Sequence, residues 1–218
     1  MTADGSEKNG SAKNPWELIP LSDYENHMRL GSVRQLQALD QMMKGQLEDF
    51  SVSSVMILGV AGGNGLEHIK RDKFDRVYGV DVNADYLKET AQRYPDLEGA
   101  LECICADLTR EAHKLPETEL IIADLLIEYI GYECFKKVIE QTKPKYASCI
   151  IQINTDSGGW VSESPYLHAF DGLERVHFQA DEKALESAMA EIGYHVKGDN
   201  SEYALPNGKK LVRADFEK

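Results

Sequence analysis

The chain has 218 residues, 42% of them hydrophobic, which suffices for one core of the size of a large domain. Its formal net charge of −13 argues against a nucleic-acid partner, because binding to phosphate backbones relies on lysine and arginine side chains. The four cysteines, Cys103, Cys105, Cys134 and Cys149, lie within apolar runs, and no histidines and carboxylates show ligand spacing, so we expect neither a disulfide nor a metal site.

The chain begins with a polar segment. Residues 1–14 are rich in Gly, Ser, Asn, Asp and Lys, and we expect a disordered tail because they can bury almost no apolar surface. They lack the apolar centre of a signal peptide, and no later stretch has the length and hydrophobicity of a membrane span. We therefore predict a cytoplasmic protein with no membrane partner.

An N-terminal helical cap is expected over residues 15–50. Apolar residues recur there at helical spacing, with an interruption near Gly31 that predicts two helices. Tyr24, His27 and Met28 are spaced to share one helical face, so a phenol, an imidazole and a thioether are expected to point the same way. Tyr24 and His27 are therefore candidate catalytic residues, and ordinary packing of the cap is the alternative.

A loop of small residues follows the first predicted strand, residues 52–58. Its sequence is Gly59-Val60-Ala61-Gly62-Gly63-Asn64-Gly65, and we expect a helix to start at Gly65. Small residues allow backbone N–H groups and the N-terminus of the following helix to lie against a ligand. The next apolar strand, residues 77–81, ends in Asp81, whose carboxylate is placed to accept hydrogen bonds from two ribose hydroxyls. The loop and Asp81 together predict a nucleotide-cofactor site.

Strands and helices alternate along the rest of the chain. This alternation predicts an α/β fold with a parallel sheet covered on both faces, and Asn207-Gly208 between apolar runs predicts a C-terminal hairpin. The later elements are expected as helix 84–94, strand 101–105, strand 120–124, helix 131–141, strand 147–154, helix 181–192 and hairpin strands 203–205 and 210–216.

The alternation Gly59-x-Ala61-x-Gly63-x-Gly65 differs from the dinucleotide fingerprint and resembles motif I of the class I S-adenosylmethionine-dependent methyltransferases. The resemblance extends over about residues 55–216. It implies a Rossmann-like methyltransferase domain over residues 51–218, with a doubly wound, seven-stranded, mostly parallel sheet and an antiparallel C-terminal hairpin. It also implies S-adenosyl-L-methionine as the cofactor.

The resemblance assigns roles to the acids at the strand ends. Asp107 is expected against the adenine amino group, and Asp124 beside the methionyl end of the cofactor. The family usually carries an acid two residues before the first glycine, where this chain has Ile57, so recognition of the amino group stays open. The expected cofactor-binding residues are Gly59, Val60, Ala61, Gly63, Asn64, Gly65, Asp81, Val82, Ala106, Asp107, Leu108, Asp124 and Leu125.

Candidates for the methyl acceptor site follow the fourth strand. Glu128 and Tyr129 are the first, and the start of a core helix at Glu128 is the alternative. The run from Glu128 is similar to the first half of the two-glutamate loop of protein-arginine methyltransferases, but the second glutamate falls at Lys137. His168 and His177 lie in a long aromatic segment, residues 155–179, of the length that is usually functional or mobile.

The acceptor class is predicted by elimination. The base-methylating signature, Asp-Pro-Pro followed by an aromatic residue, is absent after Asp124, so a small-molecule acceptor is the expectation. Two alternatives share the loop and Asp81: an NAD(P)-dependent oxidoreductase, which gives Asp107 no role, and a catalytically inactive cofactor-binding protein.

Overall fold

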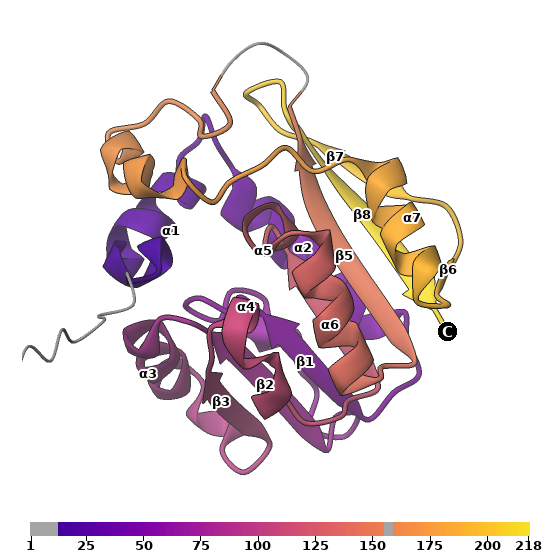
Figure 1. Cartoon of the computed structure of the whole chain (residues 1–218). Coiled ribbons are helices and arrows are strands. Elements are labelled where there is room, and N and C mark those ends of the chain that lie inside the picture. The colour runs from indigo at the N-terminus through magenta and orange to yellow at the C-terminus, as the bar shows by residue number, and fades with distance from the viewer. Residues whose placement is uncertain (1–12, 155–158) are drawn as a thin grey trace, which may run out of the picture.

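The computed structural model describes residues 13–154 and 159–218, and their apolar runs pair into one sheet (Figure 1). The strands are β1 (Ser54–Leu58), β2 (Arg76–Asp81), β3 (Leu101–Cys105), β4 (Leu120–Asp124), β5 (Tyr146–Ile153), β6 (His195–Val196), β7 (Ser201–Ala204) and β8 (Lys210–Glu217). The α-helices are α1 (Leu21–Arg29), α2 (Gln35–Glu48), α3 (Ala84–Arg93), α4 (Leu108–Glu111), α5 (Ile127–Ile130), α6 (Tyr132–Thr142) and α7 (Glu182–Glu191). Short 3-10 helices are η1 (Pro15–Leu18), η2 (Leu66–His68), η3 (Pro95–Leu97), η4 (Ala112–Lys114) and η5 (Leu167–Leu173).

The strand order is β3-β2-β1-β4-β5-β8-β6, and β7 also pairs with β8. Strands β1 to β5 run parallel to one another, and β8 runs antiparallel to β5. The short strands β6 and β7 both pair with the edge of β8 that faces away from β5, at different points along it. The described sheet therefore has eight strands in seven positions, which confirms the predicted sheet and its antiparallel end.

Strand β1 shows how the two faces of the sheet are buried. Val55 and Ile57 pack on one face with side chains of α2 and α3, while Met56 and Leu58 pack on the other with side chains of α6 and α7. All four are buried because both faces of a parallel sheet are covered by helices. Strand β1 lies between β2 and β4, and the strands that follow in the sequence are added on one side as β2 and β3 and on the other as β4 and β5. A crevice at the carboxyl ends of these strands is the usual ligand position in such sheets.

The helix expected from Gly65 was a wrong prediction. Gly65 has φ +90°, and only the short turn η2 follows it before the chain enters β2. A Cβ atom at Gly65 would collide with Met43 of α2, so α2 already fills the space beside this loop. The N-terminal cap therefore supplies the helix that covers this part of the sheet.

Within the cap, η1 and α1 lie near the carboxyl ends of the strands, whereas α2 packs on one face of the sheet. Helix α1 packs against η5 from the later segment, and Figure 1 shows the two side by side although they are far apart in the sequence. Residues 1–12 of the expected tail lie outside the described residues. Asn14 is described, and it caps η1 by accepting from Trp16 N while Glu17 accepts from Asn14 N. None of the described helices is long and apolar enough to cross a membrane.

Candidate functional site

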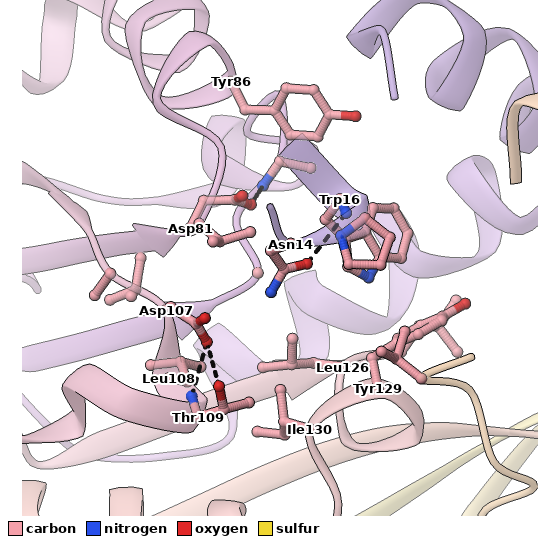
Figure 2. Close-up of a pocket in the computed structure, with 18 of the residues that line it drawn as sticks. Asn14, Trp16, Asp81, Tyr86, Asp107, Leu108, Thr109, Leu126, Tyr129 and Ile130 are labelled. Atoms are coloured by element: carbon pink, nitrogen blue, oxygen red, sulfur yellow. Dashed lines mark hydrogen bonds between the residues drawn. The ribbon is translucent and has the colours of Figure 1, made fainter. Parts of the chain in front are cut away.

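A cavity of about 380 Å³, which we call the larger cavity, lies at the carboxyl ends of β1, β2 and β4 (Figure 2). Its volume is in the range of small-molecule sites. The sheet contributes Asp81, Asp107 and Asp124 to its wall, and the cap contributes Trp16 and Tyr24. Three strand-end acids predicted from separate parts of the sequence therefore meet around one space.

The glycine loop borders the larger cavity through Gly59 and Ala61. Both residues have positive φ, +72° and +47°, and for alanine this conformation costs about 1–2 kcal/mol. The loop is tied to β2, because Gly59 N and Val60 N both donate to Val80 O. A Cβ atom at Gly59 would lie 3.3 Å from Leu126 Cδ1, so glycine keeps the backbone close to the cavity wall.

Asp81 holds this loop in place. Its Oδ2 accepts from Ala61 N at 3.0 Å, and its Oδ1 accepts from Asn83 N at 2.9 Å. Burial raises the pKa of Asp81 to about 6, although the backbone hydrogen bonds partly offset that rise. A carboxylate offers about four lone-pair sites, so both oxygens retain capacity for ligand hydroxyls.

Asp107 lies across the larger cavity from Trp16 (Figure 2). Its Oδ1 accepts from Thr109 N at 3.0 Å and from Thr109 Oγ1 at 2.6 Å, which caps α4. Its Oδ2 lies 3.9 Å from Arg110 Nε. Asp107 therefore has a structural role in addition to its place in the cavity wall.

Asp124 carries an unpartnered oxygen. Its Oδ1 accepts from Gln46 Nε2 of α2 at 2.9 Å, whereas its buried Oδ2 has no hydrogen-bond partner among the described residues. Burial raises the pKa of Asp124 to about 7. Ile57 stands two residues before the first glycine of the loop, where the methyltransferases usually carry an acid. Its side chain is 2% exposed and packs in the core away from the cavity. Among the three strand-end acids of the larger cavity, Asp124 is therefore the one with a buried oxygen that has no partner in the described residues.

Four of the expected cofactor residues do not line the larger cavity. Val60 packs over Gly79, and Asn64 Nδ2 donates to Leu36 O at 3.2 Å. Gly63 and Gly65 lie where a Cβ atom would meet side chains of α3 and α2. These residues seat the loop on its neighbouring helices. The remaining expected residues line the cavity: Gly59, Ala61, Asp81, Val82, Ala106, Asp107, Leu108, Asp124 and Leu125.

A second cavity of about 60 Å³, which we call the smaller cavity, adjoins the first. The two share a wall of Trp16, Tyr24, Leu125 and Tyr129. The remaining lining residues of the smaller cavity are His27, Met28, Gln35, Glu128, Gln152, Trp160, Val161, Ser162, Phe170 and His177. The structure therefore brings Tyr24, His27, Glu128 and Tyr129 together around one space, from two distant parts of the chain.

Glu128 is the one carboxylate among the described residues that line the smaller cavity, and it is 3% exposed. Its Oε1 accepts from Gln152 N at 2.7 Å, and its buried Oε2 has no hydrogen-bond partner in the described part of the chain. Burial raises the pKa of Glu128 to about 7. Glu128 therefore has an oxygen that can accept a further hydrogen bond, and its pKa allows it to gain or lose a proton near neutral pH.

The histidines of the smaller cavity are neutral near pH 7. Burial, together with the charge of Lys209, lowers the pKa of His27 and of His177 to about 4. His27 Nδ1 lies 2.8 Å from Ser164 Oγ, and the His177 ring stacks on Trp160 at 3.9 Å between centroids. His168, by contrast, has a side chain that is 90% exposed and pairs with Asp171, so it is not part of the site.

The sequence did not single out several residues of this site. Trp160 and Phe170 lie in the aromatic segment of residues 155–179, and both line the smaller cavity. The sequence of this segment has no periodicity that would show which rings face a cavity. Gln152 is at the end of β5, where its backbone N–H serves Glu128. Outside both cavities, Asp40, Glu67 and His68 approach one another without having shown ligand spacing, and His68 Nε2 pairs with Asp40 Oδ1 at 2.8 Å.

Comparisons with known proteins place the fold. No protein-family model matches the sequence, and no curated protein matches it. The cyclase SpnF superposes with a TM-score of 0.64 at 10% identity, over 87% of this chain and 84% of that chain. The methyltransferase domain of bacterial CtHen1-C gives a TM-score of 0.60 at 16% identity, over 88% of this chain and 97% of that chain.

A third similar structure contains a ligand. Magnesium protoporphyrin IX methyltransferase from Synechocystis PCC 6803, with bound S-adenosylmethionine, gives a TM-score of 0.60 at 9% identity, over 89% of this chain and 83% of that chain. This chain therefore has the Rossmann-like fold of the class I methyltransferases, as the glycine loop and the strand-end acids predicted.

Proposed function

We propose that this chain is an S-adenosylmethionine-dependent methyltransferase that acts on a small-molecule acceptor. The observation that carries the proposal is the pair of adjoining cavities. The larger cavity has three acids at strand ends, and the smaller cavity has the unpartnered oxygen of Glu128. A transferase needs a cofactor site and an acceptor site next to each other, so that the acceptor atom can approach the methyl carbon in line.

The residues of the larger cavity suit the cofactor. Asp81 retains acceptor capacity for two ribose hydroxyls, and Asp107 with Leu108 would border the adenine. The α-ammonium group would be held by Asp124, because its buried Oδ2 has no other partner within the described residues. This assignment gives the amino group an acid although Ile57 stands at the position that usually provides one.

When bound, S-adenosylmethionine supplies a methyl carbon on a positively charged sulfur that leaves with the carbon–sulfur electron pair, so no protein nucleophile is required. The protein has to align the acceptor atom with the methyl carbon and to exclude water. Trp16 and Tyr129 support that role, since their rings pack edge to face at 4.9 Å on the wall that the cavities share. Glu128, which lines the smaller cavity, would accept a proton from the acceptor.

One prediction follows from the raised pKa of Asp124. With a pKa of about 7, this carboxyl is about half protonated at pH 7, and a neighbouring ammonium favours its ionised form. Binding of S-adenosylhomocysteine is therefore expected to release about half a proton at pH 7 from this group. Calorimetric titration in buffers of different ionisation enthalpy measures that release.

Two matched variants show whether the proton released on binding comes from Asp124 or from another group. Asp124→Asn should bind more weakly and lose most of the release, whereas Asp85→Asn, which changes an exposed acid at the start of α3, should retain both. Release of equal size in wild type and Asp124→Asn would refute the assignment of the ammonium site.

A further inference from the structure

Half of the described residues that line the smaller cavity carry an aromatic or imidazole ring. Tyr129 packs against Trp160 at 6.1 Å and against His177 at 5.6 Å, and Phe170 packs against His27 at 4.8 Å between centroids. A cavity of about 60 Å³ has room for roughly four to six water-sized groups, since one such group needs about 10–15 Å³. It therefore accommodates the reactive end of a molecule and a few carbon atoms.

The polar groups of the smaller cavity select against an anionic acceptor. No lysine or arginine is among the described residues that line it, and the unpartnered oxygen of Glu128 offers an acceptor. Lys209 lies close enough to lower the pKa values of the histidines, but its Nζ donates to the carbonyl oxygens of Gly159 and Trp160. A carboxylate or phosphate would face Glu128 with no cationic side chain among the described lining residues to pair with it.

The pKa values of the residues that line the smaller cavity also indicate which methyl-accepting groups can react there. Burial lowers the pKa of the imidazoles of His27 and His177, and it raises the pKa of the phenols of Tyr24 and Tyr129. The environment thus favours uncharged bases and disfavours oxyanions. A phenol or an alcohol would have to approach the ionised form to react, whereas an amine reacts in its uncharged form.

We propose that the smaller cavity binds a small primary or secondary amine and that Glu128 is the catalytic residue that takes its proton. The proposal rests on the methyltransferase function proposed above. An incoming ammonium donates to Glu128 Oε2, the N–H bond breaks with its electron pair left on nitrogen, and an O–H bond forms on the carboxyl. The freed lone pair is the nucleophile, and Glu128 returns its proton to solvent when the product leaves.

Glu128 is a better proton acceptor than either histidine of the wall. Burial raises the pKa of Glu128 to about 7, whereas it lowers the pKa of His27 and of His177 to about 4, so the carboxylate binds the proton more tightly than either imidazole does. In water the ammonium would keep the proton. Burial shifts both partners toward their uncharged forms, which makes the transfer to Glu128 feasible.

The tryptophans provide a local test. The chain contains two tryptophans, and both of them, Trp16 and Trp160, line the smaller cavity. Protein saturated with S-adenosylhomocysteine is titrated with butylamine, butanol and butyrate, which have similar length, and tryptophan fluorescence is followed. We expect butylamine to bind at least tenfold more tightly than butanol, and butyrate to produce no saturable change.

Glu128→Gln is the diagnostic variant because it keeps the shape of the side chain. It should lose the preference for butylamine over butanol and retain affinity for S-adenosylhomocysteine. Glu133→Gln is the matched control, since the side chain of Glu133 is 81% exposed and pairs with Lys136. It should behave as wild type.

The outcomes distinguish the two proposals. Failure of S-adenosylhomocysteine to bind would contradict the proposed function. Binding of S-adenosylhomocysteine with equal or better binding of butanol or butyrate would overturn the amine proposal alone. The comparison of the three probes on wild-type protein decides the matter even if Glu128→Gln does not fold.

Discussion

Replacement of Asp81 by alanine is expected to weaken the binding of S-adenosylhomocysteine by about 2–4 kcal/mol, or roughly 30- to 900-fold in Kd. Under the proposed function, the variant loses the acceptor for two ribose hydroxyls. It also loses the carboxylate that accepts from Ala61 N and Asn83 N, so the glycine loop is no longer tied to the end of β2. Isothermal titration calorimetry on both proteins measures the change.

A neighbouring acid provides the control for Asp81. Asp85 is exposed on the first turn of α3, and Asp85→Ala removes the same charge only a few residues away. Its affinity for S-adenosylhomocysteine should match that of wild type, and thermal melting should show both variants folded. Equal affinity of folded Asp81→Ala and Asp85→Ala would contradict the ribose assignment.

The cap is expected to act as a lid. Trp16 and Tyr24 form part of the wall of the larger cavity, so movement of the cap would change access to it. The cap is held to the sheet by separate hydrogen bonds, from Asn83 Nδ2 to Trp16 O at 3.1 Å and from Tyr86 Oη to Ile19 O at 2.8 Å. Amides of residues 16–30 should exchange rapidly in free protein and become protected with S-adenosylhomocysteine.

Hydrogen exchange followed by mass spectrometry tests the lid, with β1 as the internal reference. Val55 to Leu58 are buried in the centre of the sheet and should stay protected in both states. Removal of the residues up to Leu30 should abolish turnover and weaken cofactor binding while the sheet stays folded. Equal protection of the cap in both states, with wild-type affinity in the truncated protein, would show that the cap only packs.

The sequence predicted the acids of the larger cavity for a physical reason. Asp81, Asp107 and Asp124 each follow an apolar run, and the carboxyl ends of parallel strands meet at one edge of a sheet. Helical spacing likewise predicted that Tyr24 and His27 share a face, and both line the smaller cavity. Local periodicity was enough for Asp81 and for the shared helical face, whereas Asp107 and Asp124 were expected in the site from the resemblance to the class I methyltransferases.

Other features depend on contacts between distant segments and were not predictable. The expected helix after Gly65 is absent because Met43 of α2, from the cap, already occupies that space. Trp160 and His177 reach the smaller cavity because η5 packs on α1 and η1, and no periodicity encodes that packing. The unpartnered oxygen of Asp124 is likewise visible only once Gln46 is seen to satisfy its other oxygen.

Titration of the purified chain with S-adenosylhomocysteine, followed by tryptophan fluorescence and by calorimetry, tests the central claim most directly. A parallel titration with NAD separates the methyltransferase from the oxidoreductase, which shares the glycine loop and Asp81. We predict saturable binding of one S-adenosylhomocysteine per chain and no saturable binding of NAD at the same concentrations. Saturable binding of NAD, with no response to S-adenosylhomocysteine, would contradict the account.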